Sequence, residues 1–451
     1  MSLPRYPQYK SSGVEWLGSI PSHWTMDRLK RRCNVFPSNV DKKTIKGERA
    51  VRLCNYTDVY YNDRIVSDMS LMDATASDEQ IAKFTLRAGD TVFTKDSETA
   101  SDIGVAAYVP SDLPGIVCGY HLSIARPGAG INGVYVKWLF DTHYTKARFA
   151  VLANGLTRVG LTQYAVDNVE LPWPPLEEQS AISKFIGRET AKIDALIAEQ
   201  EKLLALLAEK REATISHAVT HGIDPNPPLK DSGIPWLGAV PAHWQIANIK
   251  RLCELITDGA HVSPETEDGA FCFVSTKDLG RDVIDFEGCL LTSAASYEYL
   301  VRTGCQPLVG DVLFSKDGTV GRTTVVRDTQ EFVVASSLII IRPMGGRLDP
   351  DFLDYLCQSR LVKNQVQGFV KGAGLPRLSI QNLLKVVGVF PPLSEQRRIS
   401  GFLAECLERS DRLENEVLQA MSTLKERRSV LIAAAVTGQI DVRGFVEAQA
   451  A

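Results

Sequence analysis

Between residues 177 and 220, apolar side chains recur every three or four positions, a spacing that predicts a long helix with one apolar seam. Good helix formers dominate this stretch, which contains no proline. Pro174-Pro175-Leu176 and Gly222 mark the ends of the predicted helix, which would be roughly 65 Å long. The seam consists of Ile182, Ile186, Ile193, Leu196, Leu203, Leu207 and Ile215, interrupted by Glu189, Gln200 and Lys210.

The same element returns 217 residues later, between residues 394 and 437, and is again preceded by Pro-Pro-Leu at 391–393. Because a long apolar seam is not stable alone in water, we expect the two helices to pair within the chain as an antiparallel coiled coil. Their polar interruptions differ, which favours this pairing over self-association of each helix with another copy. The second seam contains Leu403, Cys406, Ser410, Leu413, Val417, Ala420, Leu424 and Leu431, with Arg427 among its interruptions.

The repeat extends over almost the whole chain and indicates a tandem duplication. Each unit begins with a Trp-Leu-Gly and His-Trp motif and later carries a Gly-Asp strand that ends in Lys-Asp. The matched pairs are residues 13–24 and 233–244, residues 89–96 and 310–317, and residues 116–127 and 332–343. A Gly-Leu-x-Arg turn follows in each unit and contains Arg158 or Arg377.

Short β-branched runs such as Val105–Val109 and Ile116–Ala125, punctuated by Gly and Pro, predict mostly-β globular parts with a few helices. The expected fold class is α/β (α+β), with two globular parts in tandem and two long helices. The predicted boundaries are 1–175 for the first globular part, 176–221 for the central helix, 222–391 for the second globular part, 392–441 for the C-terminal helix and 442–451 for a tail.

Composition narrows the class of protein. The chain has 451 residues, a formal net charge of −4 and nine cysteines without a CxxC pair, which favours a reduced cytoplasmic protein over a disulfide framework. No apolar run is long enough for a transmembrane helix, and the first residues do not resemble a signal peptide. The slight acidity argues against a uniformly basic nucleic-acid binder but leaves room for local basic patches.

The segments that match least between the units, 41–88 and 254–309, suggest two similar scaffolds that present different surfaces. Residues 27–52 carry nine Lys or Arg against three Asp or Glu, and tyrosines and asparagines follow. Basic and polar groups with interleaved aromatics suit contacts to phosphates and base edges. A solvated surface with ordinary core tyrosines explains the same pattern equally well.

Motifs for catalysis or cofactor binding are weak. Asn226-Pro227-Pro228-Leu229 lacks the aromatic residue of an adenine-methyltransferase loop, and the GxGxxG from Gly128 to Gly133 fits a turn better than a dinucleotide site. His23 with Cys33, and His243 with Cys253, supply too few ligands for zinc, so we expect buried structural roles. The repeated tryptophans are expected to pack where globular part and helix join, or alternatively to form a partner surface; they are Trp16, Trp24, Trp236 and Trp244.

The duplicated order of these motifs resembles the DNA-specificity subunit of Type I restriction–modification systems, from Gly13 to Asp441. The resemblance implies a non-catalytic subunit with two target-recognition domains, each reading half of a bipartite site in double-stranded DNA, and a coiled coil that sets their spacing. It implies two modification subunits as partners, with restriction subunits bound through them. It places S-adenosylmethionine, ATP and Mg in those partners and no cofactor in this chain. The alternative is a tandem-repeat scaffold that does not bind nucleic acid.

We expect the loops after the Lys-Asp strands to face DNA, with Lys95 and Lys316 as candidates for phosphate contacts. His121 and His261 are candidates for base or backbone contacts. The remaining DNA-contact candidates are Lys42, Lys43, Arg52, Asn55, Tyr56, Ser97, Thr99, Arg158, Lys277, Thr319, Arg322 and Arg377.

Overall fold

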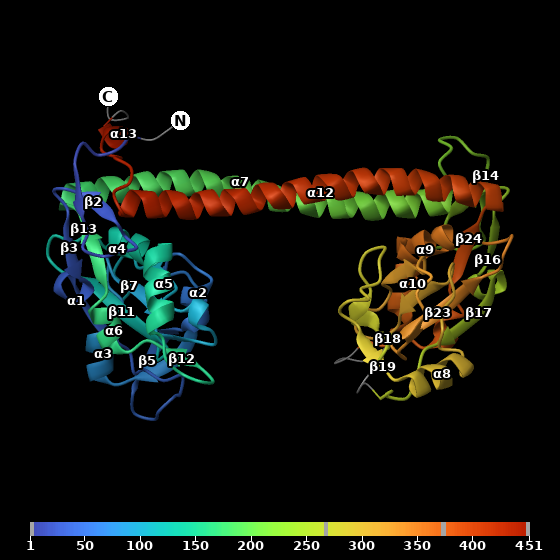
Figure 1. Ribbon diagram of the computed structural model, residues 1–451, viewed down its shortest axis with the longest axis horizontal. Helices are drawn as coiled ribbons and strands as arrows, with labels where there is room; N and C mark the ends of the chain where they lie inside the picture. The colour runs from blue at the N-terminus through green and yellow to red at the C-terminus, as the bar shows by residue number, and fades with distance from the viewer. Residues whose placement is uncertain (1–3, 266–268, 371–375, 448–451) are drawn as a thin grey trace. The chain divides into compact units, whose positions relative to one another are not determined.

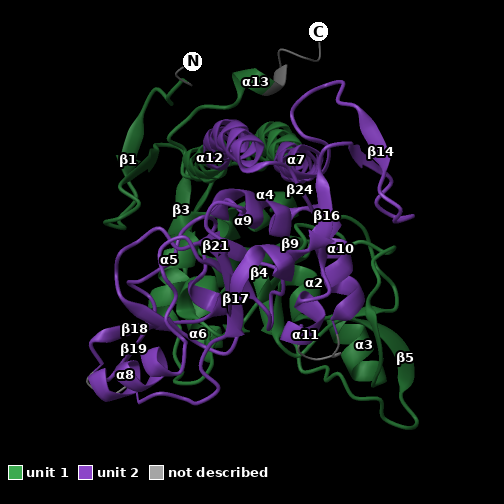
Figure 2. Cartoon of the chain, turned by 90° about the vertical axis from the view of Figure 1, so that its right-hand side faces the viewer, with its two compact units in different colours: residues 1–200, 419–451 green, residues 201–418 purple. Residues whose placement is uncertain are grey.

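The computed structural model describes residues 4–265, 269–370 and 376–447, and Figure 1 shows the arrangement of their helices and strands. The chain forms two compact units, coloured separately in Figure 2. Unit 1 comprises residues 1–200 and 419–451, and unit 2 comprises residues 201–418. The long helices α7 (Leu176–His221) and α12 (Leu393–Val436) each contribute a segment to both units.

Within each unit, the beginning of one long helix packs against the end of the other. In unit 1, Ile182 and Ile186 of α7 share a core with Ile432 and Val436 of α12. In unit 2, a second core contains α7 residues near Ile215 together with Ile399, Leu403 and Leu407 of α12. The two helices are therefore antiparallel and paired within the chain, which confirms this part of the predicted fold.

Some predicted seam positions were wrong. Leu196 is 52% exposed and Leu413 is 40% exposed, whereas Ile197 is partly buried and Met421 is buried. Ala420 is also exposed. The helices present neighbouring leucines and alanines, so several nearly equivalent heptad frames fit the sequence, and only packing against the partner helix selects one of them.

In the described residues, the globular part of unit 1 contains two larger sheets beside the two-stranded pairs β1-β2, β12-β8 and β13-β3. A four-stranded sheet has the order β4-β11-β7-β9, and a three-stranded sheet has the order β10-β5-β6. The strands are β1 (Tyr9–Ser11), β2 (Ser19–Pro21), β3 (Thr25–Arg28), β4 (Cys33–Pro37), β5 (Arg49–Cys54), β6 (Met72–Ala76), β7 (Thr91–Thr94), β8 (Asp96–Ser97), β9 (Ala106–Tyr108), β10 (Ile116–Cys118), β11 (Leu122–Pro127), β12 (Val159–Gly160) and β13 (Glu170–Trp173). The shorter helices are α1 (Leu29–Arg32), α2 (Tyr56–Tyr60), α3 (Asp78–Phe84), α4 (Gly133–Phe140), α5 (His143–Leu152), α6 (Gln163–Asp167) and α13 (Gly444–Glu447).

Unit 2 repeats this plan with the sheet orders β17-β23-β20-β21 and β19-β18-β22. Its strands are β14 (Leu229–Asp231), β15 (Ala239–Pro241), β16 (Gln245–Asn248), β17 (Cys253–Asp258), β18 (Phe271–Val274), β19 (Leu290–Thr292), β20 (Val312–Ser315), β21 (Thr323–Val325), β22 (Phe332–Val334), β23 (Leu338–Pro343) and β24 (Val387–Phe390). Its shorter helices are α8 (Ala294–Arg302), α9 (Pro350–Gln358), α10 (Arg360–Phe369) and α11 (Ile380–Leu383).

The four-stranded sheet of each unit separates two cores. In unit 1, Phe93 belongs to a core shared with α4 and the long helices, whereas Val92 belongs to the core of the three-stranded sheet. In unit 2, Phe314 and Leu313 divide in the same way. Strands β7 and β20 are therefore buried on both faces.

The repeated Pro-Pro-Leu-x-Glu-Gln segment joins each globular part to its helices. The Glu178 carboxylate lies 2.8 Å from Nε2 of His23, and Glu395 lies 2.7 Å from Nε2 of His243. The next residue, Gln179 or Gln396, accepts a hydrogen bond from the backbone at the start of α4 or α9. The two histidines therefore have structural roles, but both are exposed, so the expectation of burial was wrong for them and correct only for Cys33 and Cys253.

The four repeated tryptophans divide into two kinds. Trp24 and Trp244 are buried beside the helix ends, as predicted. Trp16 and Trp236 are 64% and 57% exposed, so the expectation of packing at the joint was wrong for them. They lie between the strands of two short hairpins, β1-β2 and β14-β15, whose own side chains are mostly exposed.

One buried position carries opposite charges in the two units. Lys137 of α4 binds Asp141 at 2.7 Å, whereas its counterpart Asp354 of α9 accepts a hydrogen bond from Gln358 at 2.8 Å. Burial raises the pKa of Asp354 to about 7, and the nearby Asp282 carboxylate adds to this effect. The other carboxylate oxygen of Asp354 is buried without a hydrogen bond.

No helix in the described part of the chain is long and apolar enough to cross a membrane.

We predict that Asp354→Asn stabilises the protein above pH 7. A carboxyl whose pKa is raised from 3.8 to about 7 by folding stabilises the fold below pH 4 and loses that contribution as the pH rises toward 7. The amide avoids burying a charge and can still accept from Gln358. Urea unfolding at pH 5 and pH 8 should therefore show a gain on the order of 2 kcal/mol for the variant at pH 8.

The control is Asp351→Asn on the same helix, since Asp351 is exposed and paired with Arg327. We expect a small change that depends little on pH. Destabilisation by Asp354→Asn at pH 8 would contradict the assignment.

Candidate nucleic-acid interface

In unit 1, the segment after β7 gathers charged groups around Asp96. Strands β8 and β12 pair so that Asp96 stands opposite Gly160, close to the Arg158 turn. One Asp96 oxygen lies 2.9 Å from Nδ1 of His121, and the other lies 3.3 Å from Nε of Arg158. The Arg158 contact is an ion pair and not a hydrogen bond, since that Asp96 oxygen has no hydrogen-bond partner. Arg158 remains 48% exposed.

Lys95 lies beside this cluster. Its Nζ donates to the backbone oxygen of Ser38 at 3.1 Å and lies 4.6 Å from the ring centroid of Tyr120. Burial lowers the pKa of Lys95, with Asp96 opposing the effect. Tyr120 itself is 51% exposed. A lysine and an exposed aromatic ring side by side offer one contact to a phosphate and one stacking surface.

Helix α2 adds tyrosine side chains to the cluster around Asp96. The hydroxyl of Tyr56 lies 3.4 Å from Oγ of Ser97, and its ring stacks on Tyr60 with the centroids 5.5 Å apart. A hydrogen bond to Asp102 raises the pKa of Tyr60 to about 12, so this hydroxyl remains protonated at neutral pH. Tyr61 is 77% exposed. The structure thus brings Tyr56, Lys95, Ser97, His121 and Arg158 together.

Unit 2 repeats the frame with different partners. Asp317 lies 2.9 Å from Nε of Arg377, and the two residues pair through their backbones, as β8 and β12 do near Asp96. Gly374 and Leu375 of this turn lie outside the described residues. Nζ of Lys316 lies 2.6 Å from Oδ2 of Asp258, which also lies 2.8 Å from Nε2 of His261. Burial alone would raise the pKa of Asp258, but Lys316 and His261 outweigh it and lower the pKa.

Three predicted contact residues are buried, and their assignment needs correction. Asn55 is 9% exposed and caps α2, Ser97 is 2% exposed, and Lys316 is 4% exposed in its pair with Asp258. As placed, none of them can contact DNA without a local rearrangement. Burial of this kind follows from strand pairing between distant segments, which the local sequence pattern does not reveal.

The other predicted residues lie apart from the Asp96 and Asp317 clusters or serve the local backbone. Lys42 and Lys43 are exposed on the loop after Val40, and Lys277 and Thr319 are also exposed. Arg52 donates to the backbone oxygen of Ser67, and Arg322 to that of Leu279. Thr99 contacts Ser101.

Sequence reasoning missed Tyr120 and the two aspartates. Asp96 and Asp317 were recognisable, because both units retain the same Lys-Asp pair. Tyr120 gives no comparable signal, since its counterpart in the second unit is Ser336. Among the described residues, no group of three or more His, Cys, Asp or Glu side chains could hold a metal ion.

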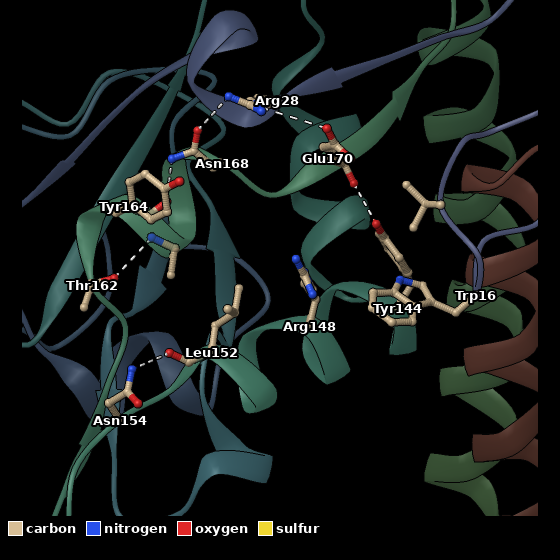
Figure 3. Close-up of a pocket in the computed structure, with 12 residues that line it drawn as sticks. Trp16, Arg28, Tyr144, Arg148, Leu152, Asn154, Thr162, Tyr164, Asn168 and Glu170 are labelled. Carbon is tan, nitrogen blue, oxygen red and sulfur yellow. Dashed lines mark hydrogen bonds and ion pairs between the residues drawn. The ribbon is translucent and has the colours of Figure 1, made fainter.

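A cavity of about 460 Å³ lies elsewhere in unit 1, and none of the predicted contact residues lines it. Figure 3 shows Trp16 and Tyr144 on one side and Tyr164 and Asn168 on the other. The Arg148 guanidinium lies 5.3 Å from the Trp16 ring, and Nε of Arg28 lies 3.9 Å from Glu170. The first contact belongs to the Trp-Leu-Gly hairpin and the second to the strand pair β3-β13, and neither belongs to the Asp96 cluster.

Residues 241–421 match the family model for the Type I restriction modification DNA specificity domain. The chain is 23% identical over 235 residues to a putative Type I restriction enzyme MjaX specificity subunit of Methanocaldococcus jannaschii, covering 52% of this chain and 53% of the relative. It is 21% identical over 370 residues to the EcoKI specificity subunit of Escherichia coli, covering 79% and 76%. The chain spans about half to two thirds of the first two curated relatives, at 53% and 64% of their lengths.

Two solved structures share the fold. A chain from a study of complex assembly and conformational transition in the type I R-M system aligns with a TM-score of 0.63 at 20% identity, covering 92% of this chain and 98% of that one. The HsdS subunit of Thermoanaerobacter tengcongensis aligns with a TM-score of 0.50 at 19% identity, covering 93% and 98%. The family model, the curated relatives and these structures thus all point to a specificity subunit of a Type I restriction–modification system, in agreement with the resemblance of the duplicated motifs.

Proposed function

We propose that this chain is the non-catalytic, sequence-specific DNA-binding subunit of a Type I restriction–modification complex. The observation that carries the proposal is the duplicated Lys-Asp and Arg frame, present once in each unit and surrounded by segments that hardly resemble each other. A constant frame with variable surroundings suits two domains that hold DNA in the same way and read different bases.

Each globular part would read one half of a bipartite site. One small domain discriminates weakly against the many competing sites of a genome, whereas two linked domains add their base contacts. In unit 1, Arg158, Lys95 and Tyr120 are the exposed or partly exposed groups that we assign to the DNA backbone and to stacking. In unit 2, Arg377 takes the phosphate role, because Lys316 is neutralised by Asp258.

We assign the partners from the resemblance to Type I specificity subunits. Two modification subunits would dock on the long helices and carry S-adenosylmethionine, and restriction subunits that use ATP and Mg would bind through them. The long helices would also set the spacer between the two half-sites, and the complex would work in the cytoplasm. The repeated joint between helix and globular part supports two equivalent docking places.

The two lysines of the repeated motif should behave differently. Lys95→Ala should weaken binding to all DNA sequences and lower the salt dependence of binding by about one unit of slope, because one phosphate contact is lost. Lys316→Ala should instead destabilise unit 2, on the order of 3 kcal/mol, because it leaves Asp258 without its buried partner. Salt-dependent DNA binding of the assembled complex and urea unfolding separate the two effects.

Lys192→Ala is the control, since this exposed lysine of α7 pairs only with Glu189 among the described residues. A change of sequence preference in Lys95→Ala, with unchanged salt slope, would refute the phosphate assignment.

The two globular parts should be exchangeable. Replacing residues 222–391 with the corresponding segment of another member of the family should change one half of the methylated site and leave the other half intact. The flanking sequences suit this exchange, because residues 222–228 form a Pro-containing connection and Pro391-Pro392 precedes α12. Methylome sequencing of cells carrying the chimaera gives the answer, and alteration of both halves would contradict independent reading.

A further inference from the structure

In unit 1, one arginine of a long helix contacts the other helix and the globular part together. Nε of Arg428 in α12 lies 2.9 Å from Oδ1 of Asp194 in α7. Nη2 of Arg428 lies 3.3 Å from Oδ2 of Asp63, which follows α2 in the globular part. The other oxygen of Asp63 accepts a hydrogen bond from Nζ of Lys137 at 2.6 Å.

Unit 2 contains a similar arrangement, in which the contact of the arginine to the globular part is an ion pair without a hydrogen bond. Nη1 of Arg211 in α7 lies 2.6 Å from Oδ1 of Asp411 in α12, and Nη2 lies 3.7 Å from Oδ2 of Asp282 in the globular part. Asp411 also accepts from Nη1 of Arg281 at 3.2 Å. The Arg211 side chain is only 11% exposed.

The helical halves of these two clusters are copies, because Asp194 and Asp411, like Arg211 and Arg428, are 217 residues apart. The third members are not copies. Asp63 and Asp282 come from the segments that differ most between the units, and Asp282 reaches its position with a φ of 61°, the only positive value for a non-glycine residue in the described chain. Such backbone is strained and persists only where the surroundings enforce it.

We propose that Arg428 and Arg211 are positioning residues, each of which fixes one recognition domain on the helix segments of its own unit. Any domain that these helices carry must then supply an acidic side chain at this place. The proposal rests on the proposed function. We call each Asp-Arg-Asp cluster a clasp, made of Asp63, Arg428 and Asp194 in unit 1 and of Asp282, Arg211 and Asp411 in unit 2.

Arginine suits this task better than lysine. Its planar guanidinium offers donors in several fixed directions, so one side chain can hold two carboxylates from different elements, whereas an ammonium is a point charge. The two clasps differ in strength. Asp63, Asp194 and Arg428 are 60%, 48% and 24% exposed, whereas Asp282, Asp411 and Arg211 are 44%, 36% and 11% exposed, so water and salt screen the first clasp more strongly. We therefore expect a larger effect from Arg211 than from Arg428.

Hydrogen exchange tests the clasp without reference to DNA. The amide of Tyr108 donates to the backbone oxygen of Asp63 at 3.0 Å, and the amide of Ile65 donates to the backbone oxygen of Tyr108 at 2.9 Å, so both amides report on the position of Asp63. In the full chain, Arg428→Ala should speed their exchange about threefold or more, as expected when a local contact opens. Asp63→Asn should act in the same direction, and Arg428→Lys should lie between the variant and the wild type.

The matched controls are the preceding residues, Arg427→Ala for unit 1 and Lys210→Ala for unit 2, both exposed and also 217 residues apart. They should leave exchange unchanged. Unchanged exchange in Arg428→Ala, or equal effects in Arg427→Ala, would overturn the proposal for unit 1. In unit 2, the corresponding probe is the amide of Gly280, which donates to Val283 across the Asp282 loop at 2.9 Å.

The functional readout is the tolerance for spacer length in the assembled methyltransferase. With Arg211→Ala, preference for the native spacing over spacers one base pair longer or shorter should fall about threefold or more, because the reading surface is held less tightly, while the half-site sequences stay the same. A purely structural loss would lower methylation of all spacers equally and would overturn the positioning role. If the wild-type complex recognises no DNA, the proposed function fails, whereas the exchange result still decides whether the clasp exists.

Discussion

The fold depends on the apolar seams of two long helices in the same chain, because each helix shields the seam of the other from water. Each unit obtains its helix pair from segments far apart in sequence, so the hydrophobic gain of closing the seam also closes the unit. In unit 1 the joint buries Trp24, Ile182 and Val436 in one core, and unit 2 repeats it with Trp244. The helices are thus part of the core of each domain and not an appendage to it.

The sequence predicted the large features because they repeat or have a strong period. The duplication, both ends of α7, the start of α12 and the paired strands after residue 89 follow from motifs that are visible twice, whereas α12 ends at Val436 and not at residue 441 as predicted. Predicting the seam frame failed at Leu196 and Leu413, since adjacent apolar residues allow more than one frame. The predicted exposure was wrong for Ser97 and Lys316, because pairing with strands distant in sequence determines which side chains are buried.

The two units show how one frame accommodates different chemistry. Lysine occupies a buried helix position in unit 1 and is paired with two aspartates, whereas aspartate occupies it in unit 2. The repeated lysine after β7 or β20 meets a backbone carbonyl in one unit and a carboxylate in the other. The two units therefore share their backbone geometry, while equivalent positions carry different charges or bind different partners.

The division of the chain has a consequence for how the protein folds as it is synthesised. Unit 2 is one continuous stretch, residues 201–418, whereas unit 1 needs residues 419–436 of α12 to complete its helix pair. The chain end is bound to its beginning, because the amide of Asp441 donates to the backbone oxygen of Pro4 at 2.8 Å and the Tyr9 hydroxyl donates to the backbone oxygen of Gly438 at 3.0 Å. Closing that very long loop is entropically costly and slow. Unit 1 therefore begins to leave the ribosome before unit 2 but can be completed only after all of unit 2 has been made.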